Sequence, residues 1–169
     1  MATPTELGIK DNSVPMSWAD AKTAISSEST LYFMGREPTA LAHYLASMES
    51  IKTKYSSVED FLRITKFDFD SRTDSVTGEA TAVRTDSSPT SSPVQIKLEL
   101  NDYPYHFSPG IVHWVIWKLN GSPLTPADIE LETDKLRKDG ATETLYWINP
   151  PHLKSIKDLD HAHILARHA

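Results

Sequence analysis

The sequence predicts an α+β domain in which N-terminal helices pack on a mostly antiparallel sheet formed by the C-terminal half. Apolar residues recur every three or four positions before residue 68, as in amphipathic helices, whereas short alternating or β-branched runs dominate after residue 93. A chain of 169 residues also suits a single hydrophobic core.

Three helices are predicted in the first half of the chain. Ser17 is placed to cap a short helix that begins at Trp18. A long amphipathic helix follows Pro38, a residue that favours the first turn of a helix. Ser56 and Glu59 have the spacing of a capping box, which predicts the start of a shorter helix.

The second half predicts four strands and one further helix. The strands are expected at residues 94–100, 110–119, 142–149 and 161–167. Between the second and third strands, Thr125 has the position of an N-cap, Pro126 that of the first helical residue and Gly140 that of the helix end. These start and stop signals predict a helix with well-defined ends.

The domain is expected to cover residues 17–169. Residues 1–16 are polar and contain prolines, so they predict a flexible N-terminus. The Ser-, Thr- and Pro-rich residues 84–93 predict a mobile loop within the domain.

Composition excludes several classes of function. The net charge is −6 and Lys and Arg form no cluster, which argues against a nucleic-acid partner. Cysteine is absent, so thiol nucleophiles, disulfides and zinc-thiolate sites are excluded. No apolar run approaches the ~20 residues that span a bilayer, and the first residues do not form a secretory signal. We therefore expect a cytoplasmic protein without a membrane partner.

Three histidines in the predicted sheet are candidates for chemistry. His161 and His163 are two residues apart in a strand, so their imidazoles should lie side by side on one face. His113 can join them if its strand is the neighbour of theirs. The three residues are predicted to be catalytic, either as ligands of a divalent metal such as Zn or Fe or as a general acid and base. The alternative is that the imidazoles only pack and hydrogen-bond within the core.

Aromatic and polar residues near these histidines predict a pocket for a small-molecule substrate or ligand. The candidate substrate-binding residues are Tyr105, Trp114, Trp117, Trp147, Asn149 and Lys154. For the aromatic rings, packing in the core is the alternative. For Asn149 the alternative is a cap of the turn before the two prolines, and for Lys154 it is a solvated surface position.

Common catalytic motifs are missing from the sequence. A phosphate-binding glycine loop, a G-x-S-x-G elbow and an H-E-x-x-H helix are all absent. Nucleoside triphosphate chemistry and serine hydrolysis are therefore not expected.

Three segments together resemble the fungal N-acetylglucosamine-induced protein family, whose biochemical activity is unassigned. The segments are "MGREPTALAHYLASMESIKTKYSSVEDFL", "YPYHFSPGIVHWVIW" and "WINPPHLKSIKDLDHAHILAR". They are similar to the family's Gly-Arg-x-Pro, Tyr-x-Ser-x-x-Asp-Phe, W-x-N-P-P-x-L-R-S and H-x-H patterns. Lys154 stands where the family has an arginine, and a lysine cannot form the bidentate contact with an anion that an arginine forms. The resemblance implies a fungal protein in amino-sugar, carbon-source or secondary metabolism.

A weaker likeness connects Asn149 and the final strand with histidine triad nucleotide hydrolases. Those proteins have three alternating histidines, whereas Leu165 occupies the third position here. The leading hypothesis is thus a small-molecule enzyme. The alternatives are a non-catalytic metabolite- or sugar-binding protein with the same pocket and, at a lower rank, a triad-like hydrolase.

Overall fold

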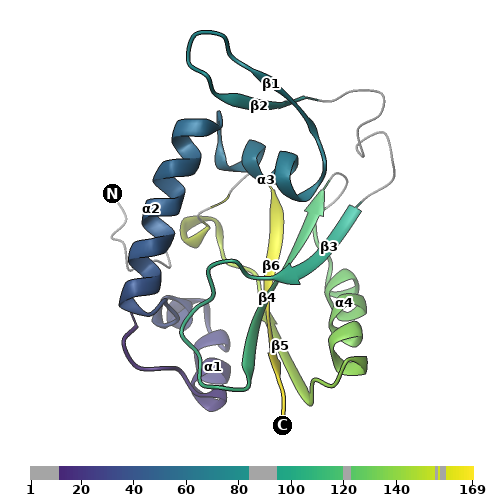
Figure 1. Cartoon of the computed structure of the whole chain (residues 1–169). Coiled ribbons are helices and arrows are strands. Elements are labelled where there is room, and N and C mark those ends of the chain that lie inside the picture. Colours follow the sequence, from purple (N-terminus) through teal and green to yellow (C-terminus); the bar gives the residue numbers. More distant parts are fainter. Residues whose placement is uncertain (1–11, 84–94, 120–122, 155, 157–158) are drawn as a thin grey trace.

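The computed structural model of the chain describes residues 12–83, 95–119, 123–154, 156 and 159–169 (Figure 1). Its helices are α1 (Trp18–Ile25), α2 (Pro38–Lys54), α3 (Val58–Lys66) and α4 (Pro126–Lys138), with short 3-10 helices η1 (Glu28–Phe33) and η3 (Pro151–Leu153). Its strands are β1 (Asp70–Thr73), β2 (Ala80–Val83), β3 (Gln95–Leu100), β4 (Ile111–Leu119), β5 (Glu143–Trp147) and β6 (Asp160–Arg167). The helices of the first half and the sheet of the second half confirm the predicted fold class.

The main sheet has the strand order β3-β4-β6-β5, and each described pair of neighbours is antiparallel. The register sets Val115 opposite His163 and Trp117 opposite His161. Because side chains alternate between the two faces of a strand, the odd-numbered residues of β4 and β6 share one face. This face, called here the odd face, carries His113, His161 and His163.

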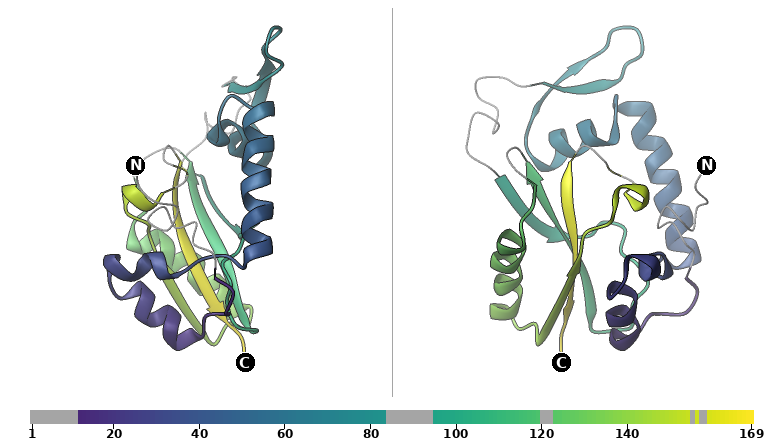
Figure 2. Two further views of the ribbon diagram at one scale, coloured as in Figure 1. Left: turned by 90° about the vertical axis from the view of Figure 1, so that its left-hand side faces the viewer. Right: turned by 180° about the vertical axis from the view of Figure 1, so that it is seen from behind.

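Helices cover both faces of the sheet. On the even face, α4 packs its Ile129 and Leu136 against Ile116 and Ile164. On the odd face, α1 and η1 cover one end and α3 covers the other. The view from behind shows α4 and α1 on opposite sides of the strands (Figure 2). The histidines lie on the odd face between these two apolar clusters.

The predicted helix ends are mostly confirmed. Ser17 and Thr125 each cap a helix with a complete capping box, formed with Asp20 and Asp128. The prediction for α3 was wrong by one residue, because the Ser57 hydroxyl, not that of Ser56, accepts from a backbone N–H of its first turn. The three-residue spacing of a capping box fits Ser56 to Glu59 and Ser57 to Asp60 equally well.

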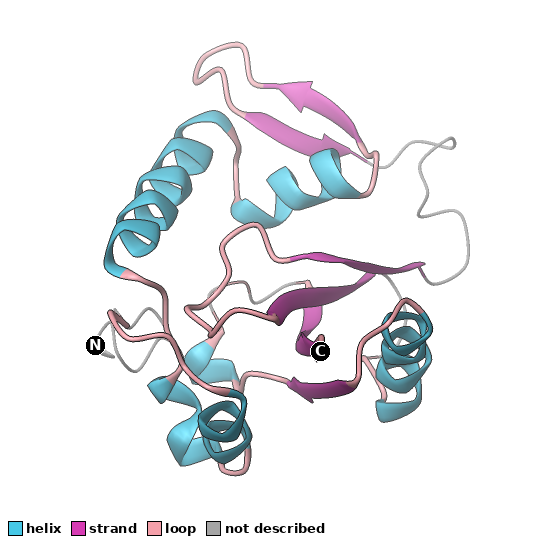
Figure 3. Ribbon diagram, turned by 60° about the horizontal axis from the view of Figure 1, so that its bottom comes forward, coloured by secondary structure: helices cyan, strands magenta, loops and turns pink. Residues whose placement is uncertain are grey.

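The β1–β2 hairpin was not predicted. It forms a separate two-stranded sheet, and the bridge between Tyr55 and Ala80 ties it to the end of α2. Figure 3 shows the hairpin beyond α3, on the side away from the main sheet. β1 is polar and exposed and β2 has only four residues, so neither is long enough to show the clear alternation of a half-buried strand.

The two segments predicted to be mobile fall largely outside the described residues. The loop at 84–93 lies entirely outside them, as do residues 1–11 of the N-terminal segment. Met16, at the end of that segment, forms a bridge with Phe107 and is therefore fixed to the domain. Among the described residues, no helix is both long and apolar enough to cross a membrane.

Candidate active site

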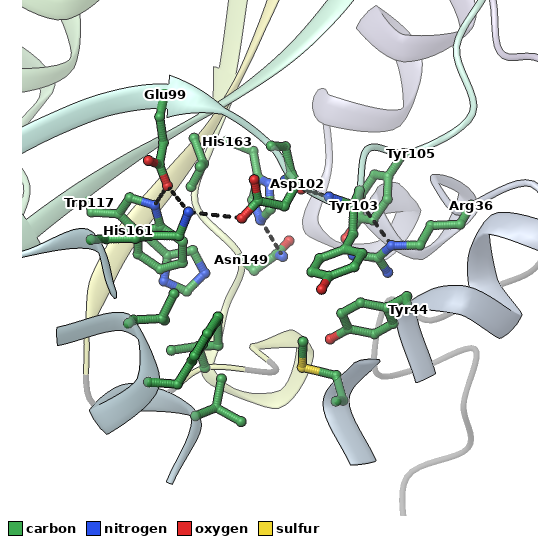
Figure 4. A pocket seen from close by; sticks show the side chains of 18 of the residues that line it. Arg36, Tyr44, Glu99, Asp102, Tyr103, Tyr105, Trp117, Asn149, His161 and His163 are labelled. Atoms are coloured by element: carbon green, nitrogen blue, oxygen red, sulfur yellow. Dashed lines mark hydrogen bonds and ion pairs between the residues drawn. The ribbon is translucent and has the colours of Figure 1, made fainter. Parts of the chain in front are cut away.

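A cavity of about 80 Å³ opens on the odd face of the sheet, between the sheet and helices α2 and α3 (Figure 4). Space of this size holds several water molecules or part of a small metabolite. Its polar and aromatic lining is formed by Arg36, Tyr44, Lys66, Glu99, Asn101, Asp102, Tyr103, Tyr105, Trp117, Asn149, His161 and His163. Strand β6 carries the two imidazoles of the lining, and the loop around Arg36 and helix α2 form the opposite wall.

His113 and His163 contact each other directly. The Nε2 atom of His113 lies 2.9 Å from Nδ1 of His163. The backbone N–H of Tyr105 donates to Nδ1 of His113 over 3.1 Å. Because a main-chain N–H can only donate, the proton of a neutral His113 ring must be on Nε2, and His113 therefore donates to His163.

The same reasoning fixes the tautomer of His163. Its Nδ1 accepts from His113, so the proton of the neutral ring is on Nε2. This N–H faces Asn149, whose Nδ2 lies 3.3 Å away. The Asn149 oxygen already accepts from Nε1 of Trp147 over 3.0 Å, which turns the NH₂ group towards His163. Two donors therefore face each other at this point of the cavity wall.

His161 has the opposite tautomer. Its Nδ1 lies 2.9 Å from the backbone oxygen of Leu159, an atom that can only accept, so Nδ1 carries the proton. The Nε2 atom of the neutral ring then has a lone pair, for which the described residues provide no hydrogen-bond donor. The ring packs against Trp117, with a distance of 4.9 Å between the ring centroids, and it lines the cavity.

Burial keeps all three imidazoles neutral. Loss of hydration, together with the nearby Arg36 charge, lowers the pKa of His113 to about 3. Burial also lowers the pKa of His163 well below its usual value, and its imidazole neighbours act in the same direction. The pKa of His161 is lowered by burial, against the opposing effect of its bond to Leu159.

Arg36 is the principal cation on the opposite side of the cavity. The residue is only 7% exposed, and its Nε donates to the backbone oxygen of Tyr103 over 2.9 Å. The guanidinium carbon lies 3.8 Å from the ring centroid of Tyr44 and 5.0 Å from that of Tyr105. Within the described chain, the guanidinium has no carboxylate partner.

The acidic residues of the cavity are paired with Lys66. Its Nζ lies 2.6 Å from Glu99 and 2.8 Å from Asp102. Glu99 also accepts from Nε1 of Trp117 over 2.9 Å. Both carboxylates are therefore engaged by Lys66, and Nζ of Lys97 also lies 4.0 Å from Glu99 (Figure 4).

The structure brings together part of the predicted site. Five of its residues line the cavity: Tyr105, Trp117, Asn149, His161 and His163. His113 and Trp147 lie directly behind that wall: the Trp147 ring stacks on His163, and the His113 ring is tilted against it. Asn149 lines the cavity, and its side-chain oxygen accepts from Nε1 of Trp147. Its predicted roles, binding a ligand or capping the turn, stay predictions.

Trp114 and Lys154 do not join the cavity. Trp114 is on the even face and packs against the cluster beneath α4. Lys154 lies 3.4 Å from Asp160 and borders a separate open hollow beside η1. Trp114 was grouped with the pocket because it is near His113 in sequence, although adjacent strand residues point to opposite faces.

The metal prediction remains untested, and the nitrogen atoms are not arranged as in a preformed metal centre. Among the described residues, no group of three or more His, Asp or Glu side chains has a geometry that could hold a metal ion. Nε2 of His113 and Nδ1 of His163 point at each other, whereas metal ligands direct their lone pairs at a common point. Nε2 of His161 is the imidazole nitrogen best placed to bind a ligand.

Arg36 and Tyr44 were not recognised as site residues from the sequence. The available signal for Arg36 was its place in the Gly-Arg-x-Pro segment, directly before the start of a predicted helix. Only the fold reveals its burial, because the segment that carries it is far in sequence from the strands that it faces.

The fold and the cavity thus define an α+β domain with a buried histidine and arginine site. The chain belongs to the family described as "Protein of unknown function (DUF3605)", whose model matches residues 17–167. This match confirms the family expected from the sequence motifs, and the yeast relative described next agrees with its fungal distribution.

A curated relative and a solved structure are similar to this chain. "Uncharacterized protein YPL067C" of Saccharomyces cerevisiae is 28% identical over 89 residues, which cover 44% of this chain and 45% of the yeast protein. The match therefore spans less than half of that relative's length. The crystal structure of HTC1 is 17% identical, with a TM-score of 0.59 over 91% of this chain and 86% of that one. This second likeness shows a shared fold.

Proposed function

We propose that this protein is an enzyme that acts on a small molecule in the cavity, with Nε2 of His161 as the general base. The observation that carries the proposal is the tautomer of His161. Its proton is held on Nδ1 by the Leu159 oxygen, so the lone pair of Nε2 is available at a cavity wall.

The neighbouring residues have supporting roles in this proposal. His163 presents an N–H donor, and His113 fixes its orientation from behind. Tyr105 and Trp117 form apolar walls that exclude water, which strengthens polar contacts between ligand and protein. Because burial lowers the pKa of His161, its ring is unprotonated at neutral pH and can take up a proton from a bound substrate.

Chemistry without a metal is the version that this geometry supports. A Zn or Fe ion could bind Nε2 of His161, but His113 and His163 would have to break their mutual hydrogen bond to join it. Treatment with a chelator is therefore expected to leave the activity unchanged.

A non-catalytic binding protein is the second candidate. It is favoured by the burial of His161, which lowers the pKa of this residue and so makes its Nε2 a weaker base. Triad-like nucleotide hydrolysis ranks lower, because Leu165 is fully buried in the core where such enzymes have a third imidazole. A cytoplasmic location and a role in fungal amino-sugar or secondary metabolism complete the proposal.

The enzyme proposal can be tested by mixing the protein with pools of small metabolites and following their consumption by NMR. Wild-type protein and the surface variant His152→Gln should consume the same compound, with or without a chelator. His161→Gln should remain folded and lose at least about 100-fold in rate, the usual contribution of a general base. A wild-type rate in His161→Gln would contradict the proposal, and saturable binding without consumption in all three proteins would favour the second candidate.

A further inference from the structure

We propose that the ligand of this cavity carries an oxyanion, either a carboxylate or a phosphate, which is bound by Arg36 and by the Nε2–H of His163. This inference deepens the proposed function and rests on it, because it names the class of molecule that the same site accepts.

The first supporting observation is the unbalanced charge of Arg36. A buried cation is strongly disfavoured unless an anion or several hydrogen bonds compensate it. Arg36 is 7% exposed, and Nε is the guanidinium nitrogen with a hydrogen-bond acceptor in the described chain. Its contacts with the Tyr44 and Tyr105 rings attract the cation but leave its charge in place. The remaining N–H groups form a fork that matches two oxygens of a carboxylate or phosphate.

The second observation is the surplus of donors at His163. The backbone N–H of Tyr105 donates to His113, and His113 donates to His163. The proton of His163 is therefore on Nε2, where it needs an acceptor. The Asn149 amide in front of it presents another donor, since its oxygen is taken by Trp147. The Asn149 amide also has a side-chain hydrogen bond with Tyr105, whereas the described residues offer the Nε2–H of His163 no acceptor. A buried donor without an acceptor is costly, and a ligand oxygen in front of this N–H would satisfy it.

The two features lie close enough for one small ligand. The ring of Tyr105 is 5.0 Å from the Arg36 guanidinium carbon and 5.9 Å from the His163 ring, both measured to the Tyr105 ring centroid. Figure 4 shows Arg36 and His163 bordering the same space. The carboxylates of Glu99 and Asp102 do not fill this role, because Lys66 holds both at the other end of the cavity.

An NMR titration of the full-length, isotope-labelled protein tests the inference without any turnover assay. The probes are inorganic phosphate, acetate and acetamide, the last being the neutral counterpart of acetate, all at constant ionic strength. Phosphate or acetate should shift the Arg36 Nε–H and the His163 signals in a saturable way, and acetamide should not. The anion that binds more tightly identifies which of the two groups the ligand carries.

Variants then assign the binding to Arg36. Arg36→Met keeps the apolar stem and should weaken anion binding by about tenfold or more, the value of a charged hydrogen-bond pair. Arg167→Met is the matched control, because it removes another arginine beside an aromatic ring, that of Trp18, outside the cavity. It should bind the anion as the wild-type protein does.

Three results would overturn the inference: no saturable shift with either anion, equal binding of acetate and acetamide, or unchanged affinity in a folded Arg36→Met. If Arg36→Met does not fold, the comparison of acetate with acetamide on the wild-type protein still shows whether binding requires an anion. A protein that binds the anion but consumes no metabolite would refute the enzyme proposal and uphold this one.

Discussion

A single backbone N–H sets the protonation pattern of the site. Tyr105 donates to His113, which must then donate to His163, whose remaining N–H points into the cavity wall. On the same strand, His161 donates to Leu159 and keeps a lone pair. Two histidines that are two residues apart therefore differ in tautomer: Nε2 carries a proton in His163 and a lone pair in His161.

Asn149→Asp tests this pattern at the scale of one residue. The new carboxylate would accept from Trp147 and from the Nε2–H of His163, and thus occupy the place assigned to the ligand oxyanion. A nearby negative charge stabilises the imidazolium, so the pKa of His163 should rise towards its ordinary value. Anion binding should be lost at the same time.

Histidine NMR signals followed against pH give the measurement, with the wild-type protein as the control. A His163 titration that is unchanged by Asn149→Asp would contradict the donor assignment.

The strand period predicted which histidines share a face. Spacing alone placed His161 beside His163, and pairing of β4 with β6 added His113. The bond between His113 and His163 could not be predicted, because it depends on the register of two strands far apart in sequence. For Trp114 the sequence was sufficient: it follows His113 in the strand, and adjacent strand residues point to opposite faces of the sheet.

At the scale of elements, capping signals were the most reliable part of the sequence. Thr125 and Ser17 both cap the helices that they were predicted to cap. The β1–β2 hairpin was missed because its strands bury no apolar stripe, and the place of Arg36 was missed because no local pattern encodes tertiary burial. Sequence reasoning therefore predicted the scaffold better than the wall of the site opposite the sheet.

Thr125→Ala should destabilise the domain by about 1 kcal/mol, the typical value of an N-cap. The Thr125 hydroxyl accepts from the backbone N–H of Asp128 over 3.1 Å, and α4 covers the even face of the sheet. Urea unfolding measures the effect. Thr53→Ala is the matched control: its hydroxyl only bonds the Ser50 oxygen within α2, so its removal should change the stability by less than about 0.5 kcal/mol. Equal losses in both variants would contradict the assigned cap.

At the scale of the whole molecule, the site occupies the gap between two apolar clusters on the odd face. The cluster beneath α1 contains Trp147 and Leu165, and the cluster beneath α3 contains Val115 and Trp117. The histidines between them are part of the folded core, so the chemistry of the site and the stability of the domain are coupled.

This coupling predicts a loss of stability in mild acid. The unfolded chain binds protons on its histidines near pH 6.5, whereas burial lowers the pKa of His113 to about 3 and those of His161 and His163 in the same direction. Stability is therefore complete above the unfolded pKa and decreases as the pH falls below it, because the unfolded state takes up more protons. From about pH 7 to about pH 5.5, His113 alone should remove about 1 kcal/mol of stability, and His161 and His163 should add to this loss.

Urea unfolding at these two pH values checks the prediction, before most carboxylates begin to titrate. His163→Gln should show a smaller loss than the wild-type protein, whereas the surface variant His152→Gln should match it. A stability that is equal at both pH values would show that folding does not lower the pKa values of these histidines, and would contradict the prediction.

The central claim is that three neutral imidazoles present a donor at His163 and a lone pair at His161. It is tested most directly by two-bond proton–nitrogen NMR of the histidine-labelled protein near neutral pH, which reports the proton on each ring nitrogen. We expect His113 and His163 to be protonated on Nε2 and His161 on Nδ1, each of them uncharged. A proton on Nδ1 of His163, a proton on Nε2 of His161, or a charged ring at any of the three positions would contradict the account.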